Sequence, residues 1–148
     1  MSSTYLDLNY HLVFSTKHRE RWILTEWRPR LHAYLGGIIR GLNGVPLSIN
    51  GVEDHVHLLI GLRSTHCLAD FMRELKKASS GWVRDETGLS FFAWQKGYAA
   101  FTVSCGFKGT VRKYILNQER HHRAVGFEEE LITLLREAEI EYDPRYLD

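Results

Sequence analysis

The stretch that most constrains the fold of this chain is EDHVHLLIG, residues 53–61, in which polar and apolar side chains alternate. Successive side chains of a β-strand point to opposite faces of the sheet, so Val56, Leu58 and Ile60 share one face while His55 and His57 share the other. An apolar stripe of this kind must be covered by helices or by another sheet. The stretch therefore predicts a strand with one buried side and a pair of imidazoles on the side away from that core.

The rest of the chain alternates between strand and helix patterns. Strands are predicted in residues 5–16, in a hairpin over residues 45–62 and in residues 95–106, and helices in residues 25–44, 65–86, 110–122 and 127–140. Thr25 and Thr65 are candidate N-caps, and Pro29 falls in the first turn of its helix. This order predicts an α+β fold, a ferredoxin-like (RRM-like) split βαβ antiparallel sheet. We expect helices on one face of the sheet, an open active-site face, and an accessory C-terminal helix.

The chain has the size of one globular domain. Its 148 residues leave little room for a second core, so we expect a single domain over residues 1–148, with a core at about 5–123 and an acidic helix at about 127–140. No apolar run approaches the roughly 20 residues that cross a bilayer, and the amino terminus lacks a signal-peptide pattern. Cys67 and Cys105 are too few for a disulfide framework. We therefore expect a soluble cytoplasmic protein.

The small net charge of +1 hides an asymmetry along the chain. Residues 1–127 carry 17 Lys and Arg against 10 Asp and Glu, whereas residues 128–148 carry 2 against 8. A basic body with an acidic tail favours a nucleic-acid partner. Basic side chains also cover the surface of most soluble domains, so the charge alone leaves that ordinary interpretation open.

Two units of the sequence carry groups suited to chemistry. His55 and His57 stand on one face of a strand, where they either chelate one metal ion or form a half-exposed surface pair. Tyr114 and Gln118 are four residues apart and share one helix face, either as a functional pair or as part of an amphipathic helix with a packed tyrosine. Glu53 and Asp54 fit a polar hairpin turn, with an extra carboxylate ligand as the alternative.

Together these units resemble a known family. HVHLLI, residues 55–60, is similar to the His-hydrophobic-His motif of HUH nucleases, and YILNQ, residues 114–118, is similar to the tyrosine helix of the single-tyrosine transposases of single-strand insertion sequences. The likeness extends to YHLVFSTKHR, LKKASSGWV and GYAAFTVS, in the same order along the chain. The chain thus resembles the transposase IS200-like family, including the REP-associated tyrosine transposases.

The resemblance implies a role for each motif residue. His55, His57 and Gln118 would bind a divalent metal ion, Mg²⁺ or Mn²⁺, and Tyr114 would be the nucleophile. The implied reaction is the metal-dependent cleavage and rejoining of single-stranded DNA at hairpin-marked ends through a 5'-phosphotyrosine intermediate. Asn117 and His121 lie near the helical face of Tyr114 and are candidates for orienting it, whereas His122 points further round.

The resemblance also implies a DNA partner and a homodimer, in a prokaryotic, nucleoid-associated setting. In many members of the family the tyrosine helix of one subunit serves the histidines of the other, and the sequence leaves open whether the sites here form within one subunit or between two. Trp94 and Tyr98 are candidates for stacking on bases, with a place in the core as the alternative. Basic side chains neutralise phosphates without reading sequence. The candidates for this role are Lys17, Arg19, Arg21, Arg73, Lys76, Lys77, Arg112, Lys113 and Arg120.

Three functions remain open at this stage. The first is a metal-dependent single-strand DNA transposase. The second is a domesticated, non-catalytic nucleic-acid-binding module on the same fold, against which the intact His, His, Tyr and Gln set argues. The third is a metal-dependent hydrolase with water as the nucleophile, for which the additional His and Asp ligands of a longer motif are missing.

Overall fold

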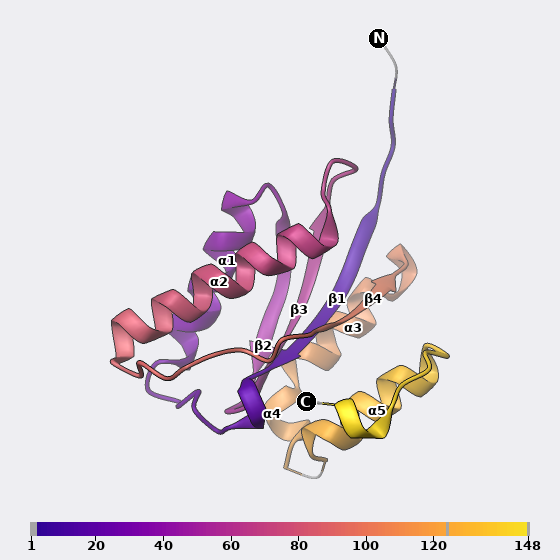
Figure 1. Cartoon of the computed structure of the whole chain (residues 1–148). Helices are drawn as coiled ribbons and strands as arrows, with labels where there is room; N and C mark the ends of the chain where they lie inside the picture. The colour runs from indigo at the N-terminus through magenta and orange to yellow at the C-terminus, as the bar shows by residue number, and fades with distance from the viewer. Residues whose placement is uncertain (1–2, 124, 148) are drawn as a thin grey trace.

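The computed structural model describes residues 3–123 and 125–147 and is built around one four-stranded sheet (Figure 1). Its strands are β1 (Leu8–Ser15), β2 (Val45–Gly51), β3 (His55–Leu62) and β4 (Ala99–Val103). They lie in the order β2-β3-β1-β4, and every neighbouring pair is antiparallel. This confirms the predicted α+β, ferredoxin-like sheet, in which β1 and β3 occupy the centre.

Two long helices cover one face of the sheet. Helices α1 (Arg28–Gly41) and α2 (Leu68–Thr87) lie side by side on this face (Figure 1). Val56, Leu58 and Ile60 are fully buried beneath them in the largest apolar cluster. The period-two pattern of the histidine strand therefore predicted the core face correctly.

Both predicted N-caps are wrong. Helix α1 begins after Trp27 and α2 after Cys67, and neither of these residues makes a side-chain capping bond. Thr25 lies instead in a turn in which Leu24 accepts the backbone N–H groups of Trp27 and Arg28. The predicted position of Pro29 in the first turn of α1 is confirmed.

The opposite face of the sheet is covered as well, which differs from the expected open face. Helices α3 (Lys108–Leu116), α4 (Gln118–His121) and α5 (Phe127–Glu137) lie against it (Figure 1). Val13 of β1 packs with α5, and Leu59 of β3 packs with Ile115 of α3. The sheet carries apolar side chains on this face too, so the segment after β4 folds back to bury them.

The helical segment of residues 108–121 is divided at Asn117, which ends α3 and precedes α4. The side chain of Asn50 on β2 donates hydrogen bonds to the backbone carbonyls of Ile115 (3.0 Å) and Leu116 (3.2 Å). This contact fixes the C-terminal end of α3 against the sheet.

Short 3-10 turns occupy Lys17–Arg19, Cys105–Phe107 and Pro144–Tyr146. Within the described residues, the helices lack the length and apolar character that a membrane span requires.

Candidate active site

The two strand histidines lie beneath the helices of the second face. His55 pairs across the sheet with Ser15 and His57 pairs with Val13, both on the central strand β1. Both imidazoles are fully buried. The predicted orientation away from the α1 and α2 core is confirmed, but the rings face a covered pocket rather than solvent.

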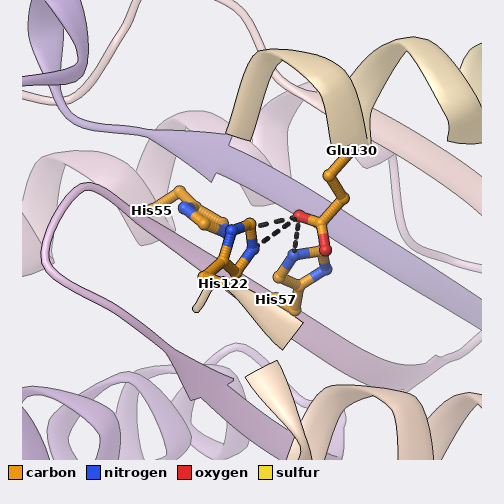
Figure 2. A group of neighbouring side chains, drawn as sticks. All are labelled: His55, His57, His122 and Glu130. Atoms are coloured by element: carbon orange, nitrogen blue, oxygen red, sulfur yellow. Dashed lines mark hydrogen bonds and ion pairs between the residues drawn. The ribbon is translucent and has the colours of Figure 1, made fainter. Parts of the chain in front are cut away.

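A carboxylate from the C-terminal helix lies at the centre of this pocket. Glu130 of α5 is only 2% exposed. Its Oε1 atom lies 2.8 Å from His57 Nε2, 3.3 Å from His55 Nε2 and 3.2 Å from His122 Nε2 (Figure 2). Three imidazoles from two separate segments thus converge on one oxygen atom.

The predicted nucleophile reaches the other oxygen of the same carboxylate. The hydroxyl group of Tyr114, on α3, donates a hydrogen bond to Glu130 Oε2. Gln118, fully buried at the start of α4, donates from Nε2 to the same Oε2 atom at 3.1 Å, and its Oε1 lies 3.3 Å from His55 Nε2. The structure therefore brings together all four residues singled out by the two motifs: His55, His57, Tyr114 and Gln118.

The Nδ1 atom of each of these histidines, on the side of the ring away from Glu130, also has a hydrogen-bond partner. His55 Nδ1 lies 2.6 Å from Asp54 Oδ1, and His122 Nδ1 lies 2.6 Å from the carbonyl oxygen of Val125. His57 Nδ1 lies 2.8 Å from Nε2 of His11, on β1. A hydrogen bond at the outer nitrogen fixes the tautomer and direction of an imidazole, and it is the arrangement found behind metal-binding histidines.

The pocket shifts the pKa values of its groups in different directions. Burial alone lowers the pKa of His55, but hydrogen bonds to Asp54 and Glu130 outweigh it and raise this pKa to about 9. For His57, burial outweighs Glu130 and lowers the pKa to about 4. Burial and the Glu130 carboxylate raise the pKa of the Tyr114 phenol well above its usual range. At neutral pH the tyrosine is therefore a phenol, and the pocket contains both a cationic and a neutral imidazole.

The donor set suits a divalent metal ion. One atom each from His55, His57, His122 and Glu130 lies within 4.8 Å of the other three. Imidazole nitrogen and carboxylate oxygen are ordinary ligands of Zn²⁺ and Mn²⁺. The amide oxygen of Gln118, beside His55 and His122, is a further oxygen donor at the same point.

Two hollows reach Tyr114 from the surface. One, of about 500 Å³, is lined by Tyr114 with Lys113, Asn117 and Arg120, and the other, of about 400 Å³, is lined by Tyr114 with His11 and Glu130 among others. Lys113 and Arg120, two of the predicted DNA contacts, thus flank an approach to the phenol. Lys17, Arg21, Arg73, Lys77 and Arg112 are exposed, and Arg19 pairs with Glu128 at 2.8 Å.

Two of the candidate DNA contacts, Trp94 and Lys76, make contacts within the protein instead. Trp94 is 7% exposed, packs edge-on against Phe14 and donates to Ser79 Oγ, so of its two expected roles the structure gives it the place in the core and not base stacking. Tyr98 is 37% exposed and stays a stacking candidate. Lys76 is half-buried, and its ammonium donates to the backbone carbonyls of residues 95, 96 and 97.

Comparison with known proteins places this arrangement in a family. The family model described as "Transposase IS200 like" matches residues 4–118, which contain both histidines of the strand, Tyr114 and Gln118. The chain belongs to this IS200-like transposase family. Among its relatives, the ISDra2 transposase TnpA of Deinococcus radiodurans is 29% identical over 76% of this chain and 84% of that protein. The transposase for insertion sequence element IS200 of Salmonella typhimurium is 27% identical over 80% and 81%.

Two solved structures are similar to this chain. A crystal structure of a protein described as a transposase from Deinococcus radiodurans R1 matches with a TM-score of 0.64 and 27% identity, over 80% of this chain and 95% of that one. A REP-associated tyrosine transposase bound to a REP hairpin matches with a TM-score of 0.62 and 16% identity, over 84% of this chain and 74% of that one. The second likeness concerns the fold alone.

Three residues of the site in this IS200-like transposase were not predicted from its sequence: His11, His122 and Glu130. Tyr114, Gln118 and His122 follow one another at intervals of four, which was a usable signal for His122. Glu130 lies three residues after Phe127 and one before Leu131, so it interrupts the apolar face of an amphipathic helix. The family match ends at residue 118, before both His122 and Glu130.

Proposed function

We propose that this IS200-like transposase cleaves and rejoins single-stranded DNA by a metal-dependent reaction in which Tyr114 forms a 5'-phosphotyrosine intermediate. The observation that supports this best is the convergence of the Tyr114 hydroxyl and the imidazoles of His55 and His57 on the two oxygens of one buried carboxylate, Glu130. A nucleophile and a set of metal ligands within reach of one another are what such a reaction requires.

The proposed step exchanges one phosphodiester for another. The phenolic oxygen of Tyr114 bonds to phosphorus, the bond from phosphorus to the 3'-oxygen breaks, and the 3'-oxygen leaves as a hydroxyl while the phenol gives up its proton. The reverse attack by a 3'-hydroxyl rejoins a strand and releases Tyr114. Since the number of ester bonds is conserved, no nucleotide cofactor is needed, and the reversibility suits a transposase.

His55, His57 and Gln118 would hold the divalent ion, Mg²⁺ or Mn²⁺. Bound there, the ion supplies a positive charge that polarises the scissile phosphate and stabilises the charge developing on its oxygens. Asp54 holds the ring of His55 in place, and the half-buried position of Tyr114 limits competing attack by water. Lys113 and Arg120 would draw a phosphate of the strand into the hollow beside the phenol.

A hairpin in single-stranded DNA is the proposed substrate. The REP-associated tyrosine transposase that shares this fold is described as bound to a REP hairpin. The exposed cations Lys17, Arg21, Arg73, Lys77 and Arg112 would contact phosphates of the hairpin and its flanks, and Tyr98 would stack on an unpaired base. The predicted cytoplasmic, nucleoid-associated location follows from this substrate.

The test is the formation of a covalent protein–DNA adduct. The protein is incubated with Mn²⁺ and labelled single-stranded hairpins from the DNA flanking its own reading frame, and the products are separated under denaturing conditions. We expect an adduct with the wild-type protein and none with Tyr114→Phe, which keeps the ring and its packing. Chelation of the metal should abolish cleavage and leave salt-sensitive binding.

Each alternative function gives a different pattern in the same assay. Binding without cleavage would support the non-catalytic module, and cleavage without an adduct would support a hydrolase that uses water. Either result with the wild-type protein would contradict the proposal. Full cleavage by Tyr114→Phe would contradict it equally.

A further inference from the structure

We propose that His122 and Glu130 join His55 and His57 as ligands of the divalent ion, so that residues beyond those matched by the family model complete the metal site. This inference rests on the proposed function in assuming that the site binds a metal, and it changes which side chains bind it. The set implied by the family resemblance contains the two strand histidines and Gln118, and it leaves the C-terminal helix without a role.

The first argument is convergence. The Nε2 atoms of His55, His57 and His122 surround Glu130 Oε1 at 3.3, 2.8 and 3.2 Å (Figure 2). They come from β3 and from the end of α4, and Glu130 reaches them from α5, so three elements contribute to one point. A group this compact matches the ligand sets of transition-metal sites, in which a few imidazoles are combined with a carboxylate.

The second argument concerns the lone pairs at His122. The carbonyl of Val125 can only accept, so the hydrogen on His122 Nδ1 is used in that contact. A neutral ring then presents the lone pair of Nε2, and this atom faces two oxygen acceptors, Gln118 Oε1 at 2.9 Å and Glu130 Oε1 at 3.2 Å. Three acceptors around one point repel one another unless a metal ion or a proton on Nε2 lies among them, and a metal ion can bind all three at once.

His55 has the same geometry, except that without a metal its ring is cationic and Nε2 carries a proton, whose place a bound divalent ion would take. Its Nδ1 hydrogen is directed at the Asp54 carboxylate, and its Nε2 faces the oxygens of Gln118 and Glu130 at 3.3 Å each. Both histidines therefore have an outer nitrogen held by an oxygen and an inner nitrogen aimed at the common point, as metal-binding histidines do. A divalent ion satisfies both inner nitrogens and the carboxylate at once.

The third argument is burial. The side chains of Glu130 and His122 are only 2% and 9% exposed, and Glu130 lies among the buried apolar residues Phe127 and Leu131 of α5. A carboxylate is withdrawn from water only where charge and hydrogen bonds compensate for it. Three nitrogen ligands with one carboxylate also favour Mn²⁺ or Zn²⁺ over Mg²⁺, which prefers oxygen.

The experiment measures metal binding without DNA. Chelator-treated protein is titrated with Mn²⁺ by calorimetry, and the rise in melting temperature with Mn²⁺ is recorded in parallel. We expect Glu130→Gln and His122→Gln each to weaken Mn²⁺ binding by about tenfold or more. A matched control should bind as the wild type does: Glu129→Gln, which removes one negative charge from an exposed neighbouring position.

A second measurement needs no variant. Pulsed electron paramagnetic resonance of Mn²⁺ bound to the wild-type protein counts the coordinated imidazoles, and we expect three. Two imidazoles would overturn the proposal. Wild-type affinity for Mn²⁺ in both Glu130→Gln and His122→Gln, together with a loss of Mn²⁺ binding in Gln118→Ala, would also overturn it. Faster cleavage of DNA by Glu130→Gln at unchanged Mn²⁺ affinity would overturn it too, because the carboxylate would then obstruct the substrate.

The two proposals fail separately. A protein that binds Mn²⁺ through three imidazoles and Glu130 but forms no adduct with DNA contradicts the proposed function and leaves this inference intact. If the wild-type protein forms the Tyr114 adduct and the Glu130→Gln variant binds Mn²⁺ with wild-type affinity, this inference is contradicted and the proposed function remains intact.

Discussion

The hydroxyl group of Tyr114 on α3 donates a hydrogen bond to the carboxylate of Glu130 on α5. The other oxygen of that carboxylate lies 2.8 Å from His57 Nε2 on β3. The proposed nucleophile and the histidine pair of one polypeptide therefore meet through a residue of the same polypeptide. We predict that the site works within one chain, without the tyrosine helix of a second subunit.

This arrangement predicts that two inactive variants do not rescue each other. Tyr114→Phe lacks the nucleophile and His57→Ala lacks a ligand, so a mixture of the two contains no chain with a complete site. We expect the mixture to cleave hairpin DNA no better than the variants do separately. Recovery of cleavage on mixing, measured by adduct formation, would mean that the active protein exchanges tyrosine helices between subunits of the predicted homodimer.

Asn50 should govern the position of the tyrosine. Its amide donates to the carbonyls of Ile115 and Leu116 and so fixes the helix end that follows Tyr114. We expect Asn50→Ala to lower the free energy of unfolding by about 1 kcal/mol and to slow adduct formation, since small displacements of a reacting group are costly. Asn50→Asp has the same shape but cannot donate, and it should be equally slow. Normal rates for Asn50→Asp would show that the side chain acts through shape alone.

Lys76 and Lys77 were both predicted to contact DNA, and the structure separates them. Lys76 donates to three backbone carbonyls of the loop before β4, whereas Lys77 is exposed. We expect Lys76→Met to lower the free energy of unfolding by about 1–2 kcal/mol, because it leaves those carbonyls without their charged donor. Lys77→Met should leave stability unchanged and reduce the salt dependence of DNA binding. Chemical denaturation and salt titrations of binding test the pair, and equal stabilities would contradict it.

His32 on α1 predicts a pH dependence of stability away from the active site. Burial, with a smaller contribution from Arg28, lowers the pKa of His32 to about 4 from the ordinary value of 6.5. The unfolded chain therefore binds this proton first, and the free energy of unfolding falls as pH drops from about 6.5 to 4, by up to about 1.4 kcal/mol per unit. His32→Leu should remove this part of the slope. Stability curves of wild type and variant that stay parallel across this window would contradict the assignment.

The sequence predicted the parts of the site that follow from local geometry. Alternation along β3 is a property of any strand, so it assigned Val56 and His57 to opposite faces without tertiary information. A spacing of four residues likewise brought Tyr114 and Gln118 to one helix face, although Asn117 divides that helix. Both relationships survive because they depend on residues close in sequence.

The parts that were missed depend on distant contacts. Glu130 meets His57 across 73 positions of sequence, and no local pattern fixes how α5 crosses the sheet. The acidic charge of residues 128–148 suggested an accessory helix, and this interpretation did not single out Glu130 as the acidic residue on the apolar face of α5. The sequence left two roles open for Trp94 for a related reason, because an aromatic residue outside a regular strand or helix gives no local sign of burial.

The identity of the residue that carries the DNA tests the central claim most directly. Wild-type protein is allowed to react with a hairpin substrate and Mn²⁺, the attached DNA is trimmed by nuclease, and the protein is digested with trypsin for mass spectrometry. Cleavage after Lys113 and Arg120 releases the sequence YILNQER, which contains Tyr114 and no other tyrosine. We expect this peptide to carry a phosphate-linked nucleotide. A modification on any other peptide, or cleaved DNA with every peptide unmodified, would contradict the assignment of Tyr114 as the nucleophile.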